Sequence, residues 1–151
     1  MKKGRIWLLL LSCLFFPFLA VAEGVSYIQN EQGQYVAKVE LHTPEELKAL
    51  FDRAENYLAN HNNYNNKTSP IAVVLHGPEV RVFQRKNYDK FKMLVDQAAR
   101  LDAYNIIDVR VCEIWMSADN ASIGELPPFV ETVPDGPKLE RELLNDGYRY
   151  F

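Results

Sequence analysis

Hydrophobic residues follow two different spacings along this chain. Residues 70–75 and 106–116 are largely apolar in consecutive positions and rich in β-branched side chains, with no internal glycine. Such runs are typical of interior strands of a parallel sheet, buried on both faces. Other apolar residues recur at three- or four-residue spacing, which predicts helices near residues 43–58, 87–104 and 135–147. Shorter strands are predicted at residues 35–41, 129–133 and 148–151.

The boundaries of the helices carry recognisable signals. Thr43 is expected to cap the first helix, with Pro44 at its first position and Glu46 completing a capping box. Residues 135–137 are expected to open the last helix and Gly147 to close it. Residues 79–84 fit either a loop or the start of a helix, and residues 117–126 have room for a short helical turn. The resulting order of strands and helices predicts an α/β fold: a three-layer α/β/α domain with a five-stranded parallel sheet.

The first 22 residues have the pattern of a secretory signal peptide. A basic start is followed by an apolar run over residues 6–19 and by Ala20-Val21-Ala22, a small-x-small cleavage site. Cleavage after Ala22 would leave a single domain of residues 23–151 in the periplasm. A weaker alternative is a lipoprotein signal in which Cys13 is the modified residue.

The charge balance limits the classes of partner. Without Lys2, Lys3 and Arg5, 14 of the 17 basic residues remain against 20 acidic ones. A chain with this acidic excess is not expected to bind nucleic acid, or the membrane surface once the leader is removed.

Cys112 is the main candidate for chemistry. It lies near the carboxyl end of the predicted strand 106–116, where ligands gather in open α/β sheets, and it is the only cysteine outside the leader. An unpaired cysteine in an exported protein suggests a reactive thiol or an intermolecular bond. Cysteine is also among the residues most often buried as a small apolar side chain. Both interpretations of Cys112, a partly accessible reactive thiol and a packing residue, stay open at this point.

A second candidate follows strand 70–75. His76 stands at the carboxyl end of that strand. Gly77 permits a close approach of the backbone, and its amide is expected to hold an anion. The sequence has no paired histidine ligands and no C-x-x-C, P-loop, G-x-G-x-x-G or G-x-S-x-G motif. We therefore expect neither a metal nor an organic cofactor.

Four segments resemble the DsrE/DsrF-like family of sulfur-relay proteins, in its exported YchN-like branch. They are residues 71–78, 109–112, 130–137 and 145–150. The resemblance implies a flavodoxin-like architecture with sheet order 4-3-2-1-5, and a cysteine that carries sulfur as a persulfide. The catalytic role carries over from the family to Cys112 only. In the sulfur-carrier hypothesis we expect His76 to act as base or thiolate stabiliser, and Gly77 and Glu113 to bind the substrate.

The sheet order has consequences for the site and for assembly. In the order 4-3-2-1-5, His76 and Cys112 lie on adjacent strand ends, and right-handed crossovers put the first three helices on one face. With two strands apolar on both sides, the other face would need a partner subunit, so we expect a homo-oligomer. The alternative order 2-1-3-4-5 distributes the helices over both faces and weakens that inference.

Two functions remain from the sequence. The first is a periplasmic sulfur carrier that exchanges sulfur with a donor or acceptor protein or with a small sulfane-sulfur compound. The second is a non-catalytic oligomeric binding module in which Cys112 is structural.

Overall fold

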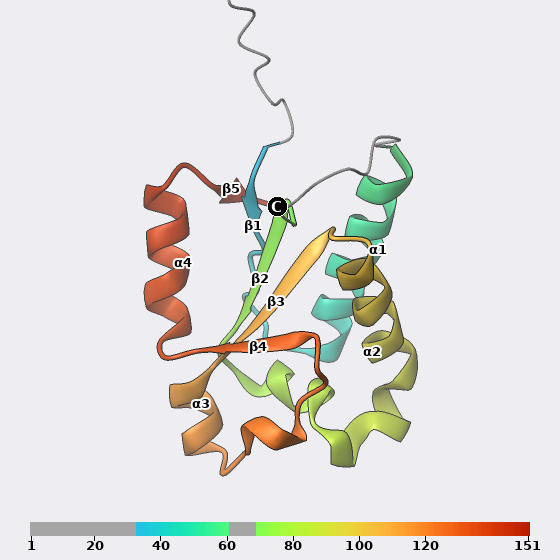
Figure 1. Ribbon diagram of the computed structural model, residues 1–151, viewed down its shortest axis with the longest axis vertical. Helices are drawn as coiled ribbons and strands as arrows, with labels where there is room; N and C mark the ends of the chain where they lie inside the picture. Colours follow the sequence, from blue (N-terminus) through green and yellow to red (C-terminus); the bar gives the residue numbers. More distant parts are fainter. Residues whose placement is uncertain (1–32, 61–68) are drawn as a thin grey trace, which may run out of the picture.

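The computed structural model describes residues 33–60 and 69–151, and the predicted signal peptide lies outside these residues. Five strands form one parallel sheet in the order β4-β3-β2-β1-β5 (Figure 1). The strands are β1 (Tyr35–Val36), β2 (Ile71–Leu75), β3 (Ile107–Cys112), β4 (Val130–Val133) and β5 (Arg149–Tyr150). The helices are α1 (Pro44–Asn60), α2 (Tyr88–Ala103), α3 (Glu113–Ala118) and α4 (Gly136–Asn145), with 3-10 helices at Pro78–Phe83, Arg85–Asn87 and Ile123–Glu125. The predicted three-layer α/β/α fold and its sheet order are confirmed.

The sheet separates two unequal layers of helices. Figure 1 shows α1 and α2 on one side of the sheet and α4 on the other. The third helix was expected beside α1 and α2, but α3 continues directly from the carboxyl end of β3. Among the described residues, no helix is long and apolar enough to cross a membrane.

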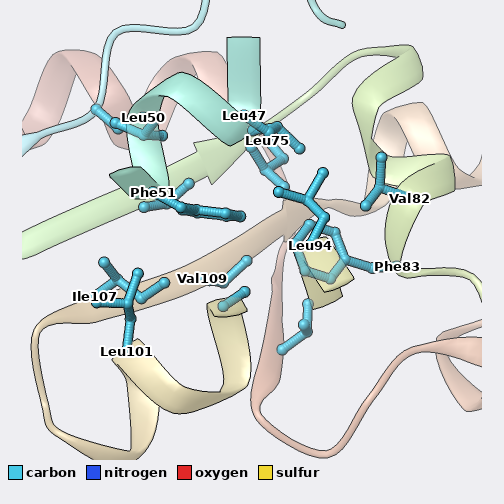
Figure 2. Packing of buried hydrophobic residues seen from close by; sticks show 14 of the residues in the cluster. Leu47, Leu50, Phe51, Leu75, Val82, Phe83, Leu94, Leu101, Ile107 and Val109 are labelled. Atoms are coloured by element: carbon cyan, nitrogen blue, oxygen red, sulfur yellow. The ribbon is translucent and has the colours of Figure 1, made fainter. Parts of the chain in front are cut away.

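The main core lies between the sheet and the α1/α2 layer. Phe51 from α1 and Leu101 from α2 are fully buried against Ile107 and Val109 of β3 (Figure 2). Burial of side chains of this size stabilises the fold by roughly 1.5–3 kcal/mol each. The helical spacing predicted for α1 and α2 is confirmed by this packing.

Strand β1 is shorter than the predicted strand 35–41. It ends at Val36, and the N–H of Ala37 makes one further bond to β2, to the carbonyl of Ala72 at 2.7 Å. The carboxylate of Glu46 accepts the N–H groups of Glu40, Leu41 and His42, at 2.8, 2.8 and 2.9 Å. The Oγ1 of Thr43 accepts the N–H of Glu46 at 3.2 Å, which confirms the predicted N-cap. The predicted capping box is only half formed, because the Glu46 carboxylate binds residues 40–42 and not the N–H of Thr43.

Strand β3 also ends earlier than predicted. The predicted strand 106–116 stops at Cys112, and Glu113 begins α3. The apolar run after Cys112 fitted a strand or a helix equally well, since short runs carry little periodicity. In the helix, Met116 is buried whereas Ile114 is 63% exposed.

The two central strands were predicted to be apolar on both faces, and this is correct only for β2. Every residue of β2 is buried. In β3, Ile107, Val109 and Val111 are buried, but Asp108 and Arg110 alternate with them and are only half-buried. One face of β3 is therefore polar over part of its length.

The last helix follows its prediction. The side chain of Asp135 accepts the N–H of Lys138 at 2.9 Å, and Gly147 follows the helix with φ of +94°. That left-handed conformation favours glycine, which explains the stop. The ambiguous segment 79–84 is mostly a 3-10 helix, and it carries a residue of the candidate site.

Candidate functional site

The structure brings His76 and Cys112 together at the carboxyl edge of the sheet. The two residues end adjacent strands, and the first residue of α4, Gly136, lies against both. A Cβ atom on Gly136 would stand 3.0 Å from the Cβ of Cys112 and 3.1 Å from the Cβ of His76. Only a glycine lets α4 begin this close to the two strand ends.

The Cys112 thiol is more enclosed than expected. A partly accessible thiol was predicted, but Cys112 is only 3% exposed and forms no disulfide. Its side chain lies on the face of the sheet that α4 covers, beneath Gly136. The start of α4 closes over it.

Glu79, which the sequence did not single out, organises the region beside His76. Its side chain is fully buried. One oxygen, Oε1, accepts the backbone N–H groups of His76 at 2.9 Å and Gly77 at 3.0 Å. The other, Oε2, is 2.9 Å from the Nδ1 of His42. A buried carboxylate with three hydrogen bonds is well satisfied, so this turn is held in one conformation.

The two imidazole rings lie together on the open side of this carboxylate. The rings of His42 and His76 meet edge to face with their centroids 5.0 Å apart. Their side chains are 27% and 23% exposed, and the Nε2 of His76 is 3.7 Å from a carboxylate oxygen of Glu140. We call His42, His76 and Glu79 the histidine cluster.

Gly77 has a different role from the one predicted. Its N–H is donated to Glu79, so this amide is already in use and the predicted anion contact does not fit. A Cβ on Gly77 would lie 2.6 Å from both the Oε2 of Glu79 and the Nδ1 of His42. The glycine is needed so that these two side chains can approach each other across the backbone.

Glu113 ties α3 to the neighbouring strand. Its Oε1 accepts the hydroxyl of Thr132 in β4 at 2.7 Å. This bond fixes the first residue of α3 next to Cys112. The structure thus gives Glu113 a positioning contact; its predicted part in substrate binding stays a prediction.

Two observations distinguish this site from a metal site and from the two hollows on the surface of the described residues. Within residues 33–60 and 69–151, no group of three or more His, Cys, Asp or Glu side chains is placed to hold a metal ion. A groove of about 670 Å³ lies between α1 and α2, and a hollow of about 320 Å³ lies between α2 and the segment before β4. Neither is lined by Cys112 or by the histidine cluster.

Fold and site together define a class: a three-layer α/β protein with a buried thiol and a histidine cluster at the carboxyl edge of a 4-3-2-1-5 sheet. No family model matches the sequence, and no curated protein matches it. Among solved structures, the chain is similar to a protein of unknown function, MTH1491 from Methanobacterium thermoautotrophicum. The TM-score is 0.58 at 16% identity, over 78% of this chain and 93% of that one. This likeness supports the fold and carries no function.

Two residues of the cluster were missed in the sequence, although each had a weak signal. His42 directly precedes the capping box at Thr43, and Glu79 follows the His76-Gly77-Pro78 turn. Their meeting depends on Glu46 holding the segment before α1, which no local pattern reveals.

Proposed function

We propose that this chain is a DsrE-like sulfur carrier that holds sulfane sulfur on Cys112 as a persulfide. The observation that supports it is the position of Cys112, which ends β3 beside His76 at the carboxyl edge of the sheet. This edge is where open α/β sheets bind ligands. The family resemblance in residues 71–78, 109–112, 130–137 and 145–150 points to the same chemistry.

The sulfur step is an exchange without net oxidation. The Cys112 sulfur, as thiolate, attacks the outer sulfur of a donor persulfide, R–S–SH. A new S–S bond forms on Cys112, the S–S bond of the donor breaks, and the donor leaves as the thiolate R–S⁻. Because Gly136 lies over Cys112, the first turn of α4 must move for the donor to reach the sulfur.

The test is transfer of sulfur to the chain without residues 1–22. We expect incubation with glutathione persulfide to add one sulfur atom to the intact mass, and Cys112→Ser to abolish the gain. Circular dichroism of Cys112→Ser should match that of the wild type. Absence of added sulfur on natively folded wild-type protein would overturn the proposal.

A second function is favoured by the burial of Cys112. At 3% exposure and in contact with Gly136, the side chain has the surroundings of a packing residue. The chain is then a non-catalytic binding module. In that case Cys112 is alkylated by iodoacetamide only after unfolding, and Cys112→Ser mainly lowers the melting temperature.

We propose in addition that the protein is exported to the periplasm and acts as a homo-oligomer. The uncovered apolar sheet face that first suggested a partner is absent from β3, since Asp108 and Arg110 lie there. The remaining support is a set of large apolar side chains exposed on the monomer: Leu41, Met93, Ile114 and Ile123. Light scattering should give a mass above one chain, and a monomer at every dilution would contradict the oligomer.

A further inference from the structure

The contact between Glu79 and His42 fixes which ring nitrogen of His42 carries a proton. The Oε1 of Glu79 is occupied by two backbone N–H groups, and Oε2 faces the Nδ1 of His42 at 2.9 Å. A carboxylate only accepts hydrogen bonds, so Nδ1 is the donor. The neutral ring then presents Nε2 as a free base on the exposed side of the cluster. A carboxylate behind an imidazole is the arrangement that orients histidines for proton transfer.

The backbone at His42 is held for this contact. Its φ of +52° lies in the left-handed region, which a non-glycine residue occupies at some energetic cost. Its N–H is bound by Glu46 at 2.9 Å, and Gly77 supplies the space in which the ring reaches Glu79. Bonds to Glu46 and Glu79, together with the space at Gly77, therefore fix the position of the His42 ring, whose side chain is 27% exposed.

We propose that His42 is the proton donor to the leaving group during sulfur transfer, and that Glu79 is its positioning residue. This inference rests on the proposed function and defines its substrate class: persulfides of small thiols, whose leaving group is a basic thiolate. His42, protonated on Nε2, gives that proton to the departing sulfur, so the donor leaves as R–SH. The proton that Cys112 lost on becoming a thiolate returns to His42 through solvent, and the reaction balances without an oxidant.

His76 has a weaker contact with a carboxylate than His42 has. The Nε2 of His76 lies 3.7 Å from Glu140, whereas His42 makes a 2.9 Å bond with a fully buried carboxylate. The titratable groups that face His42 are Glu79 from the 3-10 helix, Glu46 from α1 and the ring of His76, with Glu140 of α4 beyond that ring. The pH dependence of the reaction should therefore reflect these groups as well as His42.

The discriminating variant is His42→Asn. Asparagine tolerates the left-handed backbone and its amide N–H can replace Nδ1–H toward Glu79, but it has no counterpart of Nε2. We expect transfer from glutathione persulfide to slow about 100-fold, the usual scale of general acid catalysis. With thiosulfate the loss should stay below about tenfold, since sulfite is a weaker base than a thiolate and leaves more readily. Met93→Asn, at a position of α2 that is 89% exposed, is the control and should leave both rates unchanged.

The role of Glu79 has a readout separate from activity. Long-range proton–nitrogen NMR of the wild-type protein should show the neutral form of His42 as the Nδ1–H tautomer. Glu79→Gln should shift the ring toward the Nε2–H form. Gly77→Ala should do the same, because its added Cβ would force the Glu79 and His42 side chains apart. A wild-type His42 in the Nε2–H form would overturn the inference.

The outcomes separate this inference from the function on which it rests. If the wild-type protein gains no sulfur from either donor, the proposed function fails and this role of His42 fails with it. If the wild-type protein gains sulfur and His42→Asn reacts as fast as the wild type with each donor, only the role of His42 is overturned. Equal losses with both donors, accompanied by a lower melting temperature, would make His42 a structural residue and overturn its role as an acid.

Discussion

The two faces of β3 are built on opposite principles. Toward α1 and α2, Ile107, Val109 and Val111 are fully buried in the main core. Toward the α4 layer, Asp108 and Arg110 pair with each other at 2.6 Å, with roughly 30% of each side chain exposed. One strand can therefore close a core with one face and remain polar on the other. A strand built in this way needs no second subunit to cover it.

The largest expected effect is a loss of stability on the apolar face. Ile107→Ala removes a fully buried side chain from the core shown in Figure 2 and should lower the free energy of unfolding by about 2–5 kcal/mol. Urea denaturation of the wild type and the variant measures it. A loss below about 1 kcal/mol would mean that this face is not tightly packed.

The next effect concerns the carboxyl edge, where the face under α4 becomes enclosed. Gly136→Ala places a methyl group 3.0–3.3 Å from Cys112, His76 and Val74. Two of these contacts are with Cβ atoms, which cannot move without the backbone, so we expect a loss of about 1–3 kcal/mol. Gly124→Ala is the matched control, because the only atom near its added methyl group is a serine hydroxyl at 3.8 Å. An unchanged melting temperature for Gly136→Ala would contradict the close contact of α4 with the strands.

The polar face should contribute much less. A double-mutant cycle of Asp108→Ala and Arg110→Ala should give a coupling energy of about 0.2–1 kcal/mol, because both side chains are partly exposed and screened by water. Addition of salt should reduce it further. A coupling above about 2 kcal/mol would indicate that this face is covered in solution, and light scattering should then show an oligomer.

The smallest effect depends on pH. Partial burial raises the pKa of Asp102, and the nearby carboxylates of Asp108 and Glu131 raise it further. The folded chain therefore binds this proton more tightly than the unfolded chain, and the stability it contributes is lost as the pH rises through the raised pKa. Asp102→Asn, which stays neutral, should gain no more than about 0.5 kcal/mol at neutral pH, because water screens this partly exposed group. The gain should vanish near about pH 3, where the carboxyl group is protonated in both states. Thermal unfolding at the two pH values measures it, and a loss of stability at neutral pH would contradict the raised pKa.

Much of this architecture could be predicted from the sequence because its signals are local. The run in residues 70–75, the cap at Thr43 and the stop at Gly147 each depend on a few neighbouring residues, and each was confirmed. The end of β3 was missed because the apolar residues after Cys112 suit a strand and a helix alike. The polar face of β3 was missed although Asp108 and Arg110 alternate with buried residues. Two polar positions within a long apolar run were too few to indicate a polar face.

The candidate site, too, could be predicted only in part. The adjacency of His76 and Cys112 follows from strand order, which a resemblance supplied and the structure confirmed. The pairing of His42 with Glu79 joins residues 37 positions apart through a turn that Glu46 shapes. Sequence patterns describe elements well, whereas such contacts between loops depend on how the elements are assembled.

The pairing of β1 with β5 has a consequence for how the chain folds. Tyr35 aligns with Arg149 and Val36 with Tyr150, and the rings of Tyr35 and Phe151 meet with centroids 5.6 Å apart. This contact joins opposite ends of the described chain, so its loop-closure entropy is among the largest in the fold. Strands β2, β3 and β4 can pair as they emerge during synthesis, but this edge of the sheet must wait until β5 has been made. Closure of the β1–β5 edge is therefore expected to be a late event on the folding pathway, with the open edge of β1 prone to mispairing until then.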